Sequence, residues 1–243
     1  MNGLIFFALP IYYLVIIYVT AALLPAFFLM RYIYVHDTIE KEPPLLLLSL
    51  VVRGVLAALA AAVLEMIGKA LLGSFVPADS PNYIFYFAFL VVAATEEGMK
   101  YLFLYRKTWR NPNFNCRFDG IVYAAFVSLG FAGFENILYI FQYGLSVALP
   151  RAILAIPGHL GFSVFMGFFY SRAKRRYDMG KITTARIHLL LAYLAPVFLH
   201  GVYDSCCMLG SNMSTVVFLL FVAAMYFIVI RLIKRESRTD RPI

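Results

Sequence analysis

The stretch LIFFALPIYYLVIIYVTAALLPAFFLM, residues Leu4–Met30, contains no charged side chain. Two further apolar runs, Leu45–Leu64 and Val216–Ile230, are almost free of charge. A helix that crosses a bilayer needs about 20 apolar residues, so these runs predict transmembrane helices. A membrane β-barrel would instead alternate polar and apolar residues over strands of about ten, and no stretch does so. We therefore predict an all-α, polytopic transmembrane helical bundle.

The composition supports this fold class over the whole chain. Of the 243 residues, 63% are hydrophobic and 14% are charged, whereas a soluble domain carries about 25% charged residues. The same apolar excess excludes a disordered chain. Seven spans are expected, at roughly 4–30, 44–68, 83–105, 118–143, 151–171, 187–209 and 213–231. The connections are too short to fold alone, so residues 1–243 form one membrane domain.

The basic residues follow the connections between the spans. The net charge is +8. Seventeen Lys and Arg residues lie in the loops after the first, third and fifth spans and in the C-terminal tail, against two, Lys69 and Arg151, on the other side. Because Lys and Arg are enriched on the cytoplasmic side, we expect the N-terminus outside and the C-terminus in the cytoplasm. The charge thus reflects topology, and we expect the lipid bilayer but no nucleic acid as a partner.

Ionisable side chains within the spans are costly, at roughly 2.5 to 3.5 kcal/mol each near the bilayer centre, and so they indicate function. They lie on four consecutive predicted helices, within about 83–209, and at a similar depth. The candidates are Glu96, Glu97 and Lys100 on the first, Glu135 with its neighbour Asn136 on the second, His159 on the third, and His200 and Asp204 on the fourth. We therefore expect one common site.

Helical spacing and the chemistry of peptide hydrolysis suggest roles for these residues. Lys100 can reach either Glu96 or Glu97, and Asp204 can orient His200, because residues three or four apart are neighbours on a helix. Peptide hydrolysis needs a base for water and donors for the oxyanion.

Our candidate base is Glu96, although Glu97 remains open, and Glu135 could share a proton with it. His200 could donate to the oxyanion, and His159 could bind substrate or complete the donor set.

Four ordered motifs carry a resemblance to a known family. Glu96-Glu97-x-x-Lys100, Phe131-x-x-x-Glu135, Pro157-Gly158-His159 and His200-x-x-x-Asp204 resemble the signatures of the PrsW family of bacterial intramembrane proteases. That family belongs to the glutamic membrane protease clan, which includes the type II CAAX prenyl endopeptidases. The similarity runs from about Thr95 to Asp204. Glu135 and Asp204 stand where the CAAX branch typically has His and Asn, which argues against prenylated substrates.

The family resemblance also implies a cellular location and a substrate, which the residues alone do not indicate. It implies a multi-pass protease of the bacterial plasma membrane. Its substrate would be a membrane-anchored anti-sigma factor, cut on the extracytoplasmic side so that release of a stress sigma factor begins. We expect no cofactor, because Lys100 beside the carboxylates and the lack of a recognised metal triad favour water activated by protein groups alone.

Two other functions remain possible from the residues. A zinc metalloprotease would use Glu96, Glu135, His159, His200 and Asp204 as ligands. The chain has no His-Glu-x-x-His motif, and Lys100 would place a cation beside the metal. A proton-coupled transporter would also line its bundle with acids and histidines, but the sequence shows no internal repeat of the kind many transporters have.

Two expectations concern the second span. Gly54, Ala58 and Ala62 are small residues at four-residue spacing, which predicts close packing against another helix. Glu65 and Arg53 are expected near the membrane interfaces, where long charged side chains extend towards water.

Overall fold

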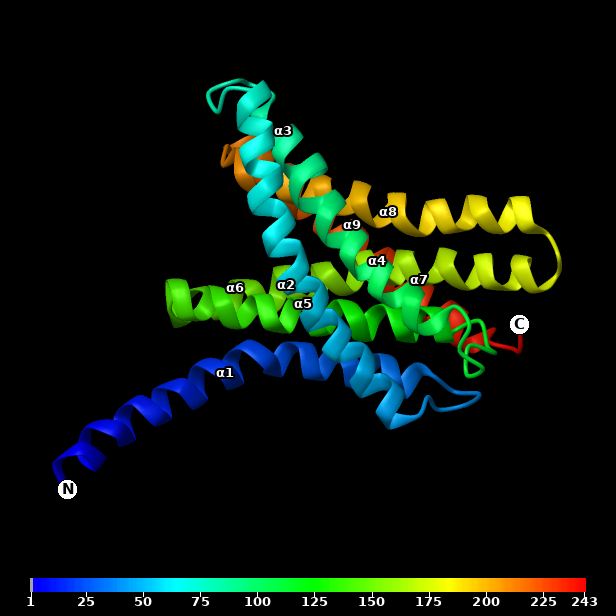
Figure 1. The fold of residues 1–243 in the computed structure, drawn as a ribbon, viewed down its shortest axis with the longest axis horizontal. Coiled ribbons are helices and arrows are strands. Elements are labelled where there is room, and N and C mark those ends of the chain that lie inside the picture. Colours follow the sequence, from blue (N-terminus) through cyan, green and yellow to red (C-terminus); the bar gives the residue numbers. More distant parts are fainter. Residues whose placement is uncertain (1) are drawn as a thin grey trace.

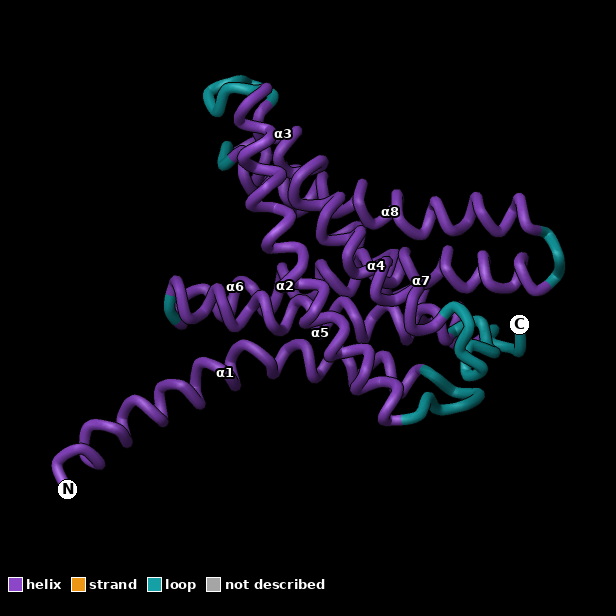
Figure 2. The backbone as a smooth tube through the Cα atoms, viewed as in Figure 1, coloured by secondary structure: helices purple, strands orange, loops and turns teal. Residues whose placement is uncertain are grey.

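The computed structural model describes residues 2–243 and is built of helices joined by short loops (Figures 1 and 2). The all-α prediction is confirmed, since the described residues contain no strand beyond an isolated bridge between Cys116 and Pro242. The elements are α1 (Asn2–His36), α2 (Pro44–Phe75), α3 (Tyr83–Tyr86), η1 (Phe87–Ala93), α4 (Ala94–Thr108), α5 (Asp119–Tyr143), η2 (Leu145–Val147), α6 (Ala148–Pro150), η3 (Arg151–Ala155), α7 (Ile156–Asp178), α8 (Ile182–Leu209) and α9 (Asn212–Arg238).

Six helical segments of the described chain are long and apolar enough to cross a membrane. They are Ile11–His36, Pro44–Phe75, Asp119–Tyr143, Leu145–Asp178, Ile182–Leu209 and Asn212–Arg238. The third expected span, 83–105, is helical as well, but the π-helical segment η1 divides it and it carries Glu96, Glu97 and Lys100. The chain is therefore a multi-pass bundle in which the least apolar long segment carries the acidic pair.

Helix α5 lies at the centre of the bundle and packs closely against α2 and α7. A Cβ atom added to Gly54 of α2 would lie 2.0 Å from the carbonyl oxygen of Val127 in α5, so the two backbones are in contact there. Gly167 of α7 approaches Gly120 of α5 in a similar way. These contacts require glycine, and they fix the distance between the helices that carry the candidate site residues.

The small-residue stripe on α2 is only partly as predicted. Gly54 and Ala58 are buried, but Ala62 is exposed, and Ala57 and Ala61 are buried instead. Four residues cover 400° of an α-helix, so a strict four-residue repeat drifts by 40° per step and leaves the contact face. The face that packs on α5 combines three-residue and four-residue steps.

The basic loops gather at one end of the bundle, where Figure 1 also shows the C-terminus and the turn between α7 and α8. The loop before α5 binds the C-terminal tail, since the Arg117 N–H donates to the Arg241 carbonyl and the Ile243 N–H donates to the Asn115 carbonyl. The Asn115 side chain also donates to Glu40 in the loop between α1 and α2. This grouping agrees with a single membrane side for the basic loops; its cytoplasmic assignment stays a prediction.

Candidate active site

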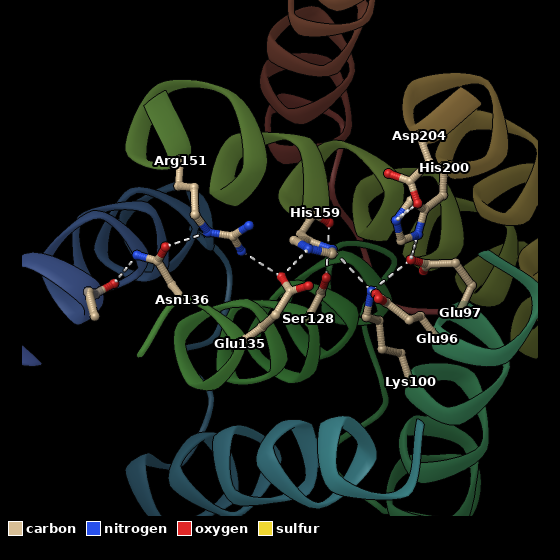
Figure 3. Close-up of polar contacts among 11 residues, drawn as sticks. Glu96, Glu97, Lys100, Ser128, Glu135, Asn136, Arg151, His159, His200 and Asp204 are labelled. Atoms are coloured by element: carbon tan, nitrogen blue, oxygen red, sulfur yellow. Dashed lines mark hydrogen bonds and ion pairs between the residues drawn. The ribbon is translucent and has the colours of Figure 1, made fainter. Parts of the chain in front are cut away.

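Five of the predicted site residues line one cavity of about 240 Å³: Glu96, Glu135, His159, His200 and Asp204. It is lined by residues of α2, η1, α4, α5, η3, α7 and α8, and Figure 3 shows most of its polar side chains. The ionisable groups lining it include Glu65, Glu96, Glu135, Arg151, His159, His200 and Asp204. The four motifs therefore converge on a common space inside the bundle.

Lys100 connects the polar side chains of α4 with His159 of α7 (Figure 3). Its buried ammonium donates to Glu96 Oε2 at 3.1 Å and to Glu97 Oε1 at 2.7 Å. It also lies 3.1 Å from His159 Nδ1. The ring of Phe131 faces the ammonium with its centroid 4.1 Å away. Lysine at this position thus reaches both glutamates at once, and the phenylalanine of the second motif covers it.

The two adjacent glutamates differ in access to the cavity. Glu96 lines it. Glu97 is completely buried, and its Oε1 accepts from Lys100 and contacts His200 Nδ1. Its Oε2 has no hydrogen-bond partner among residues 2–243. Of the two, only Glu96 is placed to contact a water or a peptide in the cavity.

His200 lies between two carboxylates. Its Nδ1 is 2.9 Å from Glu97 Oε1, and its Nε2 is 3.3 Å from Asp204 Oδ2. The Phe162 ring stacks on the imidazole at a centroid distance of 4.7 Å. Asp204 is adjacent to His200, as their spacing predicts, but the contact with Glu97 could not be read from either helix alone. The Asp204 contact is the longer one and borders the cavity.

His159 uses both ring nitrogens within the network. The Lys100 ammonium can only donate, so His159 Nδ1 accepts and the ring hydrogen must be on Nε2. Nε2 is 3.1 Å from Glu135 Oε2, to which it donates. Ser128 fixes the same residue by donating to its backbone carbonyl at 2.9 Å. His159 therefore connects Lys100 with Glu135 and has no further N–H to offer.

Arg151 completes the network on the far side of Glu135. Its Nη2 donates to Glu135 Oε2 at 2.8 Å, and its Nε donates to Asn136 Oδ1 at 2.7 Å. Asn136 in turn donates to the Ala22 carbonyl of α1. Glu135 makes no hydrogen bond to Glu96 in the described chain, so its contacts favour a carboxylate held by Arg151 and His159 over a proton shared between the two glutamates.

Two charged residues of the cavity lining, Arg151 and Glu65, were not among the predicted site residues. In the sequence, Arg151 is one of only two basic residues expected on the outer side. Its rarity there was the feature that could have marked it as a site residue. Glu65 was expected near the interface, yet it lines the cavity together with Glu96. Figure 1 shows that α2 crosses α5 at a slant rather than running parallel to it. Glu65 lies far from either end of a 32-residue apolar helix, and this position could have indicated a role inside the bundle.

Two π-helical segments precede site residues. η1 ends three residues before Glu96, and η3 ends four residues before His159. Pro157 lacks an N–H and cannot bond the carbonyl of Ile153. The Tyr226 hydroxyl of α9 reaches that carbonyl at 2.8 Å and the Leu154 carbonyl at 2.9 Å. The Pro-Gly pair thus leaves the helix continuous, and α9 satisfies the backbone that the proline frees.

The donor atoms of the site are close enough together to hold a metal ion. Those of Glu96, Glu97, His159 and His200 all lie within 4.8 Å of one another. However, the Lys100 ammonium contacts three of these four groups. Among the buried ligand atoms of this set, Glu97 Oε2 has no hydrogen-bond partner in the described chain. One free oxygen is too few, because zinc needs at least three protein ligands. As arranged, the site does not fit a metal ion, because the Lys100 ammonium already provides the positive charge that these groups bind.

Comparison with known proteins gives a consistent result. A family model described as "PrsW family intramembrane metalloprotease" matches residues 42–231. The chain is 33% identical to Protease PrsW of Geobacillus kaustophilus over 92% of this chain and 94% of that protein. It is 30% identical to Protease PrsW of Clostridioides difficile over 84% and 85%, and 31% identical to Protease PrsW of Bacillus subtilis over 76% and 80%. No solved structure matches the chain.

Proposed function

The chain belongs to the PrsW family of bacterial intramembrane proteases, and we propose that it hydrolyses a peptide bond with water activated by Glu96 rather than by a metal ion. The observation that carries this proposal is the position of Lys100. Its ammonium contacts three of the four residues in the only set of the described chain that could hold a metal, while Glu96 keeps access to the cavity. The metal in the family's description is therefore not carried over to this chain.

In the proposed reaction Glu96 accepts a proton from water as the water oxygen attacks the peptide carbonyl carbon. The Lys100 ammonium, 3.1 Å from Glu96 Oε2, favours the ionised form of this carboxylate before the attack. The carbonyl oxygen becomes an oxyanion, and His200 Nε2 donates to it by exchanging its 3.3 Å contact with Asp204. Glu96 then returns the proton to the peptide nitrogen, so the C–N bond breaks and an amine leaves. Glu97 orients Lys100 and His200 throughout.

The proposed substrate is a membrane-anchored protein, because the cavity lies within the bundle. On the predicted topology, Arg151 and the cavity side of α7 lie towards the outside. An anti-sigma factor cut on its extracytoplasmic side, as the family resemblance implies, would meet the cavity from that side. Identification of a membrane protein that accumulates uncut in cells lacking this chain would test the substrate class.

The mechanism is tested with purified protein and a membrane-anchored peptide. Glu96→Gln should abolish cleavage while the protein remains inserted and extractable, because the amide keeps the shape but cannot accept the proton. Glu40→Gln, at an exposed position outside the cavity, is the matched control. Turnover within tenfold of the parent would rule out Glu96 as the base.

Prolonged chelation separates the two catalytic types. Activity should survive it if protein groups alone activate the water. Loss of activity on chelation, followed by recovery with zinc, would establish the metal-dependent alternative and would require Lys100 to leave the donor set.

A further inference from the structure

A second polar pocket lies at the end of the bundle that holds the basic loops. It has a volume of about 180 Å³ and opens between α5, α7, α8 and α9. Its polar lining is Arg117, Ser171, Arg172, Arg175, Arg176 and His188. One acid, Glu236, also borders it, but this carboxylate is bound by the exposed Arg235 at 2.7 Å. The pocket therefore has four guanidinium groups and one acid that is already paired.

The basic side chains are crowded by the fold. Arg172, Arg175 and Arg176 lie within two turns at the end of α7, where Arg172 is three and four residues from the other two, so their charges repel each other. Arg117 approaches them from the loop before α5. Burial together with the neighbouring Arg175 and Arg241 lowers the pKa of Arg117, and Glu236 and Asp240 only partly oppose this. An anion bound among these groups would relieve the repulsion.

Two buried donors in the same pocket lack partners. Ser171 is 5% exposed, and its hydroxyl has no hydrogen-bond partner among residues 2–243. The Arg117 Nε group is buried and likewise unpartnered there. A buried polar group without a partner costs about 1 to 3 kcal/mol, so such groups usually have a ligand or water. Both are hydrogen-bond donors, which is what an anion requires.

From this lining we propose that the pocket is a binding site for a phosphate group, with an anionic phospholipid headgroup as its source. Arginine binds phosphate oxygens with paired, charge-assisted hydrogen bonds. The pocket lies between transmembrane helices at their basic end, and basic pockets of this kind hold anionic headgroups on the cytoplasmic side of membranes. The site is separate from the cavity around Glu96, and its lining shares no residue with it.

The full chain, purified in detergent and freed of lipid, is titrated with short-chain phosphatidylglycerol, short-chain phosphatidylcholine or inorganic phosphate. The thermal unfolding midpoint reports binding, and native mass spectrometry counts retained lipid. Phosphatidylglycerol should bind saturably, whereas phosphatidylcholine should have no effect. Arg175→Gln should weaken the apparent affinity by about tenfold or more, the loss expected for one charged hydrogen bond. Arg110→Gln, exposed and outside the pocket, should not change it.

A purely structural role for Arg175 would give a different pattern. Removing one like charge should raise the midpoint of the lipid-free Arg175→Gln protein while weakening its response to phosphatidylglycerol. Arg175→Lys should retain more binding than Arg175→Gln, and Ser171→Ala provides a second, nearly isosteric variant. If inorganic phosphate alone protects equally, the phosphate site stands but its source is a soluble anion. Unchanged phosphatidylglycerol affinity in Arg175→Gln and Ser171→Ala would overturn the proposal.

Discussion

Lys100 is the single side chain on which the charge balance of the active site depends. Its side chain is 1% exposed and contacts two carboxylates that are themselves buried. Because all three groups are buried, removal of the ammonium would leave the two carboxylates to repel each other. A buried ion pair that loses one partner typically costs about 3 to 5 kcal/mol, because the remaining charge stays buried without compensation.

Lys100→Met should therefore lower the unfolding midpoint in detergent sharply as well as abolish activity. Lys69→Met, on the exposed part of α2, is the matched control and should leave the midpoint unchanged. The double variant Lys100→Met/Glu97→Gln should recover part of the lost stability, because it removes the uncompensated charge. A single Lys100→Met variant as stable as the parent would show that the network does not hold the charges together.

His200 and Asp204 should act as one unit if His200 donates to the oxyanion. His200→Ala should lower the cleavage rate about 10² to 10³-fold, the range for loss of one such donor. Asp204→Asn should cost less, since the amide can still hold the ring. The double variant should resemble His200→Ala alone. Rates measured under single-turnover conditions provide the check, and fully additive losses would place Asp204 in a separate role.

The sequence predicted contacts within one helix better than contacts between helices. Lys100 with Glu96, and His200 with Asp204, follow from four-residue spacing. The contacts of Lys100 with His159 and of His200 with Glu97 depend on how α4, α7 and α8 are rotated about their axes. That rotation is set by packing over the whole bundle, which no local spacing encodes.

At the scale of helices, the closest approach of α2 and α5 is at Gly54. A Cβ at Gly54 would lie 2.0 Å from the Val127 carbonyl oxygen, a backbone atom that cannot rotate away. Gly73 lies on the same helix, and a Cβ added there would meet no atom within 4 Å. Substitution by alanine can therefore be compared at two glycines of one helix, Gly54 with a close backbone neighbour and Gly73 without one.

Gly54→Ala should separate α2 from α5 and lower the unfolding midpoint, with an overpacking cost of about 1 to 3 kcal/mol or more. Gly73→Ala should leave the midpoint unchanged or raise it, because alanine favours the helix by up to about 1 kcal/mol. Thermal unfolding in one detergent compares the two. Equal midpoints would mean that the helices adjust at the crossing without cost.

The positions of the long helices could be predicted from the sequence, but the π-helical segments within them could not. The apolar runs located the long helices to within several residues, since length and hydropathy decide insertion. The π-helical segments η1 and η3 were not predicted, although Pro157 marked the second one. A π-helical turn depends on partners elsewhere, such as the Tyr226 hydroxyl at the Ile153 carbonyl, and a single helix sequence does not reveal these.

On the scale of the whole molecule, the ends of distant elements meet in an acidic cluster. Asp37 follows α1, Glu42 precedes α2, and Asp240 lies in the C-terminal tail. Asp37 is completely buried, and neither of its carboxylate oxygens has a hydrogen-bond partner among residues 2–243. Glu42 accepts a hydrogen bond from Tyr123 of α5 at 2.7 Å. This cluster links the first and last parts of the chain, which the sequence pattern did not indicate.

The cluster predicts how stability depends on pH. Burial raises the pKa of Asp37 to about 6 and the pKa of Glu42 to about 7, above the values near 4 expected in the unfolded chain. Between about pH 4 and pH 7 the folded protein therefore binds more protons than the unfolded one, and the free energy of unfolding falls as pH rises through this window. Above it both states are ionised and the contribution of these groups no longer changes.

The expected result is a higher unfolding midpoint at pH 5 than at pH 8 in the same detergent. Asp37→Asn should raise the midpoint at pH 8, because the amide fills the same space without a charge, and should flatten the slope. Asp79→Asn, exposed in the loop after α2 and outside the cluster, should preserve the slope of the parent. Each removed pKa unit corresponds to about 1.4 kcal/mol, so the effect should be measurable. A midpoint that rises with pH in the parent, or an Asp37→Asn protein with the parent's slope, would show that this carboxylate does not control the acid stability of the clustered ends.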